Sequence, residues 1–454
     1  MKYSTSSPLL IRADWLWTAA GSALALGGVL IENGLIAAVL TKSEADQARQ
    51  LGRHQDLQIV DLKSSVVTPG LINLHTHLDY SQAQSIDEGL PLFTWMAQLV
   101  GGSRSWSKDD FLRSAIFGAE ACARAGTSYV VDSSYTGLAA AALAQVGLKG
   151  LVGLELFGLD ESAAENIFAS WTERYQSLIG TASGALADAL ARRQIAITVA
   201  PHAPYTVSPA LWQQACQWAQ AEDSLLIAHL AESDQECRWL ADHSEILDQY
   251  LRRMIPPGAK STDDLLQQIK GSWTTRGLSP TAHLAQFGLL DENLLAAHCV
   301  QMTEPDFKIF AAAGARAAIC RRSNKRLLCG QANMAAMSRH SIKFGLGTDS
   351  LASCSDLSLL KEAATWLDQI SAADALKAIT INAAAAVNLS NSIGSITVGK
   401  AADLAVFPLK NALPESGGLE EALAQALLHD APPASDLLVG GKFVLRAGKV
   451  LACS

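Results

Sequence analysis

The 454-residue sequence lacks several features that would assign it to common functional classes. It has no cluster of lysine and arginine resembling a phosphate-binding stripe, and its formal net charge is -9, so nucleic acid is not expected as a partner. Its eight cysteines include no C-x-x-C pair, and several lie in apolar runs where a thiol acts as a small hydrophobic side chain. The first residues contain no apolar stretch long enough for a signal peptide or membrane span. We therefore expect a reduced, cytoplasmic protein without a membrane partner.

The composition is that of an ordinary globular protein, with 49% apolar and 17% charged residues. The length suggests more than one domain, although an α/β barrel exceeds 250 residues as one unit. Both ends of the chain show short strand patterns separated by Gly, Asn and Ser. We expect these two ends to meet in one small β domain.

The middle of the chain alternates between apolar, strand-like runs and helical segments rich in Ala, Leu and Glu. The runs cover residues 71–77, 127–132, 151–156, 195–200, 225–230, 294–299, 315–320 and 342–348. Eight near-continuous apolar strands with helical crossovers predict a parallel (β/α)8 barrel of the TIM type. A doubly wound open sheet is the alternative, but no glycine-rich phosphate motif follows any run. The predicted α/β fold has a barrel over residues 69–389 and a small β-sandwich domain formed by residues 1–68 and 390–454.

Ionisable side chains lie where several of these strands end, and these ends meet at one face of a barrel. In chain order the residues are His75, His77, His202, His229, His298 and Asp349. His75 and His77 are two residues apart on one strand, so both imidazoles point to the same face. Taken singly, each histidine is better explained as a hydrogen-bonded core residue, and Asp349 as a helix cap. Together they would be costly to bury without a cation. Three imidazoles and one carboxylate, with a position left for water, are typical of a catalytic zinc site.

Five sequence segments in this order resemble a known superfamily. They are PGLINLHTHLDYS, APHAPYTVS, HLAESDQE, AAHC and LGTDSLAS, between about residues 66 and 360. They are similar to the cytosine-, guanine- and adenosine-type deaminases and triazine chlorohydrolases of the amidohydrolase superfamily. The β-rich ends match the small flanking domain of these enzymes. The resemblance therefore covers essentially the whole chain.

The resemblance implies a metal held by His75, His77, His229 and Asp349. Dinuclear members have a bridging lysine near the end of the fourth strand, and the corresponding stretch IAITVAPHAPY has none. One divalent ion is therefore expected. Zn²⁺ is favoured, and Fe²⁺ and Mn²⁺ are compatible with the same nitrogen and oxygen ligands.

The resemblance also implies catalytic roles. Glu232, three residues after His229, matches the general acid/base that protonates a ring nitrogen, although alone it would be assigned to a helix N-terminus. His298 would orient and polarise the attacking water, and Asp349 would be both ligand and proton acceptor. His202 matches a substrate-binding histidine.

Two further segments concern the substrate. Related nucleoside deaminases have an acidic residue before a tryptophan, where it binds sugar hydroxyls, but this chain has Thr94 before Trp95. Trp95 is either a wall of the substrate pocket or a packing residue of a helix. Residues 321–326 form a basic loop, which favours an anionic substrate or is simply solvated.

The sequence therefore predicts a metal-dependent hydrolase that deaminates an amino-substituted, purine-like heterocycle. It is also similar to aminodeoxyfutalosine deaminases. A triazine-type chlorohydrolase or aminohydrolase is the nearest alternative, because it uses the same water and much the same site. A catalytically inactive scaffold is disfavoured by the intact set of ligands. The expected partner is a small heterocyclic molecule, and a homodimer is compatible with the resemblance.

Overall fold

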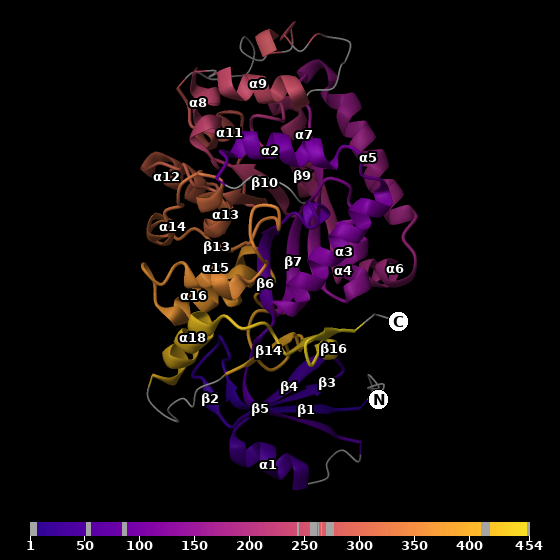
Figure 1. Cartoon of the computed structure of the whole chain (residues 1–454), viewed down its shortest axis with the longest axis vertical. Coiled ribbons are helices and arrows are strands. Elements are labelled where there is room, and N and C mark those ends of the chain that lie inside the picture. Colours follow the sequence, from indigo (N-terminus) through magenta and orange to yellow (C-terminus); the bar gives the residue numbers. More distant parts are fainter. Residues whose placement is uncertain are drawn as a thin grey trace.

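The computed structural model describes residues 7–50, 56–83, 89–242, 245–254, 261, 263–264, 266–268, 277–409 and 418–451. A parallel α/β barrel forms the larger part of the protein (Figure 1). Its strands are β6 (Leu71–Thr76), β7 (Thr127–Ser134), β8 (Lys149–Leu156), β9 (Ile195–Pro201), β10 (Leu226–Leu230), β11 (Leu294–His298), β12 (Arg316–Ile319) and β13 (Phe344–Leu346). Each of the eight predicted runs overlaps one of these strands. The predicted (β/α)8 barrel is confirmed.

The barrel consists of two parallel four-stranded sheets, β6 to β9 and β10 to β13. Backbone hydrogen bonds at the C-terminal ends of the strands join the two sheets. The amide of His229 donates to the carbonyl of His202 at 2.8 Å, and the amide of Asp349 donates to the carbonyl of His75 at 2.9 Å. Gly347 permits the second contact, because a Cβ at this position would lie 2.8 Å from the backbone nitrogen of His75. The closure of the barrel therefore brings the predicted site residues together.

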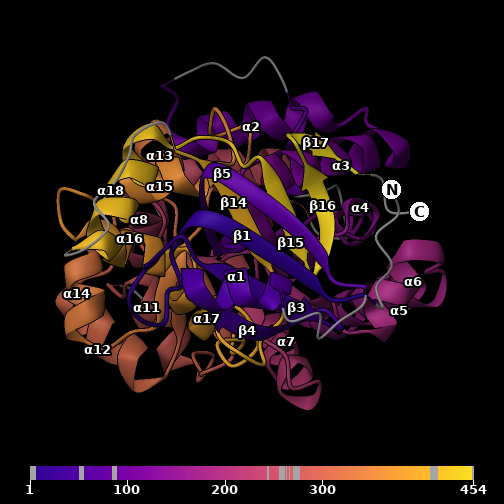
Figure 2. The same cartoon turned by 90° about the horizontal axis from the view of Figure 1, so that it is seen from below.

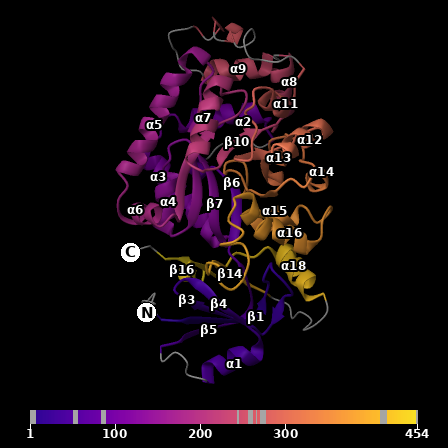
Figure 3. The same ribbon diagram turned by 180° about the vertical axis from the view of Figure 1, so that it is seen from behind.

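Helices cover the barrel and its loops, as Figures 1 and 3 show from opposite sides. They are α2 (Leu92–Ser103), α3 (Lys108–Arg124), α4 (Ala139–Val146), α5 (Ala164–Gly180), α6 (Gly184–Ala191), α7 (Pro209–Ala221), α8 (Asp234–Asp242), α9 (Glu245–Met254), α11 (Pro280–Gln286), α12 (Glu304–Ala312), α13 (Arg321–Arg326), α14 (Met334–Arg339), α15 (Leu359–Ala364), α16 (Ala372–Ala378) and α17 (Ile381–Ala386), with 3-10 turns at Leu78–Tyr80 and Glu161–Ala163. Polar caps set several helix starts. Ser107 and Asp110 form a capping box before α3, and Ser208 precedes Pro209 at the start of α7.

Both ends of the chain form the small β domain. Its elements are β1 (Leu9–Leu16), β2 (Leu24–Ala25), β3 (Gly28–Glu32), β4 (Leu35–Leu40), α1 (Lys42–Gln50), β5 (Gln58–Pro69), β14 (Leu404–Pro408), β15 (Asp436–Val439), β16 (Lys442–Arg446) and β17 (Lys449–Val450). Helix α18 (Leu419–Asp430), between β14 and β15, packs against α15 and α16 of the barrel. Strand β5 pairs in parallel with β1 and antiparallel with β14, so it joins the two ends of the chain. Figure 2 shows these strands side by side. The prediction of a small β domain from both ends is confirmed, and its described strands belong to one mixed sheet.

A buried ion pair links the small domain to the barrel. The Nζ of Lys149, at the start of β8, lies 2.8 Å from both carboxylate oxygens of Asp403. The Asp403 side chain is 2% exposed and also accepts a hydrogen bond from the amide of Gly440. The barrel end that faces the small domain is thus held to it, and the opposite end, beneath α2, α8 and α9, carries the candidate site (Figure 1). Among the described residues, no helix is long and apolar enough to cross a membrane.

Candidate active site

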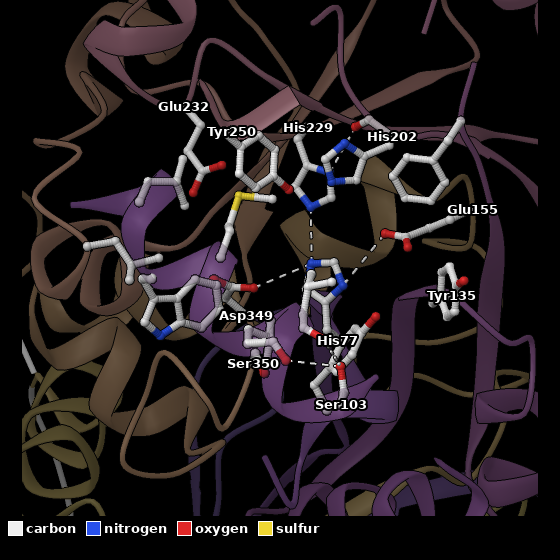
Figure 4. Close-up of a pocket in the computed structure, with 18 of the residues that line it drawn as sticks. His77, Ser103, Tyr135, Glu155, His202, His229, Glu232, Tyr250, Asp349 and Ser350 are labelled. Carbon is white, nitrogen blue, oxygen red and sulfur yellow. Dashed lines mark hydrogen bonds and ion pairs between the residues drawn. The ribbon is translucent and has the colours of Figure 1, made fainter. Parts of the chain in front are cut away.

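The C-terminal ends of the barrel strands bring a group of buried imidazoles together. The Nε2 atoms of His77 and His229 lie 3.0 Å apart, and the Oδ1 of Asp349 lies 3.6 Å from the Nε2 of His77 (Figure 4). The same oxygen lies 3.6 Å from the Nε2 of His75. Donor atoms of His75, His77 and His229 lie within 4.8 Å of one another, and so do those of His75, His298 and Asp349. The structure therefore brings residues at the ends of β6, β10 and β11 together with Asp349 in the loop after β13.

The donor atoms in this group fit a metal ion. The Nδ1 atoms of His77 and His229 lie 2.9 Å from the carbonyls of Ser133 and His202, respectively, which assigns the ring proton of each neutral imidazole to Nδ1. Both Nε2 atoms then carry lone pairs that face each other. Neither ring nitrogen of His75 has a hydrogen-bond partner among the described residues, although this side chain is 1% exposed.

Burial, with the neighbouring histidines, lowers the pKa of His75 and of His229 well below the usual value. Both imidazoles are therefore neutral, and each can offer a nitrogen lone pair to a metal ion. Three imidazole nitrogens and a carboxylate oxygen form a ligand set that suits zinc.

Asp349 is held as a carboxylate. Burial alone would raise its pKa, but His77, His298 and the hydroxyl of Ser323 outweigh burial, and the pKa lies below its usual range. The hydroxyls of Ser323 and Ser353 donate to Oδ2, which leaves Oδ1 toward the histidines. The backbone of Asp349 has a φ of 60°, in the left-handed region that costs free energy for a residue other than glycine.

Glu232 lies in the loop after β10 and is 4% exposed. The carboxylate of Glu236 accepts hydrogen bonds from the amides of Ala231, at 3.1 Å, and Glu232, at 2.8 Å, so it fixes this loop. Burial raises the pKa of Glu232 well above the usual value, and Asp349 adds to the effect. Burial therefore favours the protonated, neutral form of this carboxyl group.

His298 faces Glu232 from the end of β11. The Nδ2 of Asn324 lies 3.0 Å from the Nδ1 of His298 and donates to it, which leaves the ring proton on Nε2. That Nε2 lies 3.6 Å from the Oε1 of Glu232. Burial lowers the pKa of His298 to about 4, so the imidazole is neutral and can donate from Nε2.

A cavity of about 370 Å³ opens over these residues, a volume within the range of small-molecule sites. His202 lines it. Its Nδ1 lies 2.8 Å from the hydroxyl of Thr206, and its ring lies 4.8 Å from that of Phe157. Trp95 also lines the cavity and donates from Nε1 to the carbonyl of Ala352 at 3.3 Å. Thr94 is exposed and is not part of the lining.

Sequence reasoning missed the buried carboxyl groups beside His77. The Oδ2 of Asp79 accepts hydrogen bonds from Ser134 and Thr136, and Asp79 belongs to neither group of side chains that could hold a metal ion. Burial raises the pKa of Glu155 to about 8, as it does for Asp132. Glu155 lines the cavity. The signal that could have found it is a carboxylate at the end of the apolar run LVGLEL.

The basic segment 321–326 does not line the cavity with its arginines. Arg321 pairs with Asp368 at 2.8 Å and stacks over Trp366, and Arg322 pairs with Asp356 at 2.9 Å. These partners account for the guanidinium groups of Arg321 and Arg322, and neither Lys325 nor Arg326 lines the cavity. The segment therefore lends no support to an anionic substrate.

A sequence model of the amidohydrolase family matches residues 66–434, which is most of the chain. The chain belongs to the amidohydrolase family. Among curated relatives in this family, the 5-methylthioadenosine/S-adenosylhomocysteine deaminase of Desulforudis audaxviator is 28% identical over 417 residues, which cover 88% of this chain and 84% of that protein. The deaminase of the same name from Pyrococcus furiosus is 26% identical over 437 residues, 93% of this chain and 91% of the relative.

Solved structures of similar fold agree with this family assignment. An adenosine deaminase from Xanthomonas campestris with bound zinc superimposes with a TM-score of 0.76 at 24% identity, covering 99% of this chain and 95% of that one. Helicobacter pylori aminofutalosine deaminase in complex with methylthio-coformycin gives a TM-score of 0.76 at 20% identity, covering 96% and 100%. At these identities the likeness concerns the fold of this amidohydrolase.

Proposed function

We propose that this amidohydrolase deaminates an adenine-type nucleoside by hydrolysis. One observation carries the proposal: Glu232, a buried carboxyl group with a raised pKa, lines the same cavity as a group of side chains that could hold a metal ion. Hydrolytic deamination requires an activated water and an acid that protonates the heterocycle, and this arrangement offers both. The similarity to 5-methylthioadenosine/S-adenosylhomocysteine deaminases along most of both chains supports the nucleoside substrate.

Four side chains would hold one divalent ion, for which zinc is the best candidate: His75, His77, His229 and Asp349. When bound, such an ion supplies the Lewis acidity that makes a water molecule a nucleophile near neutral pH. The absence of a lysine near the end of β9 favours a single ion.

The other roles belong to side chains of this chain. Glu232 donates its proton to the ring nitrogen adjacent to the carbon that water attacks. His298 donates from Nε2 to the attacking oxygen and so orients it. Asp349 accepts a proton from that oxygen. Asp349 then passes this proton to the amino group, which leaves as ammonia when the carbon–nitrogen bond breaks. The remaining hydroxyl gives its proton to the Glu232 carboxylate, and a carbonyl remains on the ring.

The walls of the cavity suit a flat ring with an attached substituent. Aromatic side chains dominate the lining, among them Tyr80, Trp95, Phe157 and Tyr205. Such walls bind a heterocycle by stacking and exclude water from it. His202, neutral because burial lowers its pKa to about 3, contributes a polar ring on the same wall and would bind the substrate.

The proposal is tested by ammonia release from the zinc-loaded protein. The panel contains adenosine, 5-methylthioadenosine, S-adenosylhomocysteine, guanine, cytosine and atrazine, and the matched control is the same protein after chelation. We expect ammonia from at least one adenine nucleoside and none after chelation. No release from any of the three nucleosides would overturn the proposal, and chloride release from atrazine alone would assign the triazine reaction instead. Sedimentation of the same preparation tests the predicted homodimer.

A further inference from the structure

Glu155 is a polar group of the cavity wall that the proposed mechanism does not use. It lies near the end of β8 and is 5% exposed (Figure 4). Its Oε1 lies 3.9 Å from the Nδ1 of His77, but that nitrogen already donates to the carbonyl of Ser133 at 2.9 Å. Within the described part of the chain, no hydrogen bond reaches the carboxyl group of Glu155. The carboxyl group lies on the cavity wall, where a bound ligand can reach it, so this group points to a ligand that supplies a hydrogen-bond partner.

The surroundings of Glu155 narrow the chemistry of that ligand. The exposed rings of Tyr135 and Phe157 line the same wall, with centroids 6.4 Å apart. The positive charge of Arg174 lowers the pKa of Glu155, but its guanidinium group donates a hydrogen bond to the carbonyl of Tyr135 at 2.7 Å. The negative charges of Asp79 and Asp132 raise the pKa of Glu155. This wall thus combines aromatic faces with acceptor oxygens, which suits a sugar carrying hydroxyl groups and disfavours a carboxylate.

We propose that Glu155 is a specificity-determining residue that binds the sugar hydroxyls of the nucleoside. This inference rests on the proposed function and names the part of the substrate that contacts this wall. Thr94 is exposed and outside the cavity lining, so position 94 offers no carboxylate for the same task. Glu155 reaches the cavity from a different strand and supplies that acceptor.

The test compares Glu155→Gln with the wild-type protein on adenosine and on 2',3'-dideoxyadenosine. Glutamine keeps the size of the side chain but replaces one carboxyl oxygen by an NH2 group, which donates and does not accept hydrogen bonds. We expect kcat/KM for adenosine to fall by about 10- to 100-fold, mainly through KM, while that for the dideoxy compound changes little. Zinc content is expected to stay at the wild-type level. Glu165→Gln, an exposed position on α5, is the matched control for loss of one carboxylate.

The outcomes separate this inference from the proposed function. Equal losses on both nucleosides, or loss of zinc, would mean that Glu155 acts through His77 and would overturn the inference while the deaminase proposal stands. If Glu155→Gln kept the wild-type preference for adenosine over 2',3'-dideoxyadenosine, the inference would be overturned as well. If the wild-type protein turns over neither nucleoside, the proposed function fails, and calorimetric binding of the same pair decides the inference. The inference is supported if the wild-type protein binds adenosine more tightly than 2',3'-dideoxyadenosine and Glu155→Gln abolishes this preference. It is overturned if the wild-type protein binds neither compound or binds both equally.

Discussion

The substitution Glu232→Gln removes a proton donor from the site while leaving its shape unchanged. The side chain is 4% exposed, and its Oε1 lies 3.6 Å from the Nε2 of His298 and 4.0 Å from the Sγ of Cys329. The loop is fixed through backbone amides that donate to Glu236, so glutamine can occupy the same space. Because burial favours the neutral acid, neutral glutamine matches the charge of that form.

The expected loss follows from the role of general acid. Proton transfer by a positioned side chain contributes about 10²- to 10⁴-fold to the rate. We therefore expect kcat to fall by that factor, which is about 3–5 kcal/mol of barrier. Bound zinc is expected to stay at the wild-type level, because Glu232 is not in the group of metal-binding donors.

The assay is ammonia release at saturating nucleoside, with zinc measured by atomic emission on the same samples. Thermal unfolding shows whether the variant folds, and a shift below about 1 kcal/mol is expected for a change of equal volume. A kcat within about tenfold of the wild type would refute the role of proton donor. Loss of zinc with retained folding would instead move Glu232 into the metal site.

Three further substitutions test other parts of the structure. His75→Ala removes a metal-binding nitrogen, and we expect native mass spectrometry to show loss of most bound zinc, whereas retention of a full ion would contradict the assigned ligand set. Asn324→Ala removes the side chain that donates to the Nδ1 of His298, and we expect kcat to fall about tenfold with the zinc content unchanged. An unaltered kcat would show that this hydrogen bond has no catalytic role. Lys149→Met leaves Asp403 buried without its cation, so urea titration should show about 3–5 kcal/mol less free energy of unfolding, and an unchanged midpoint would argue against the ion pair.

Much of the fold is predictable because its determinants are local and repeat along the chain. Each apolar run of the middle region forms a strand, since a strand buried on both faces reads as a continuous hydrophobic segment. The position of His75, His77, His229 and His298 at strand ends is visible in the same way. Closed barrels collect such ends at one face, so the sequence also predicted that these histidines meet.

The sequence by itself determined the barrel, the small β domain and the residue types that gather at one end, because periodicity and motif spacing are properties of the chain. Only the tertiary structure decided the partners of individual side chains. It pairs Arg321 and Arg322 with distant carboxylates, directs Asn324 to a histidine, and places Glu155 on the cavity wall. These contacts join residues far apart in the sequence, and their free energies depend on distances of a few ångströms that no local pattern encodes.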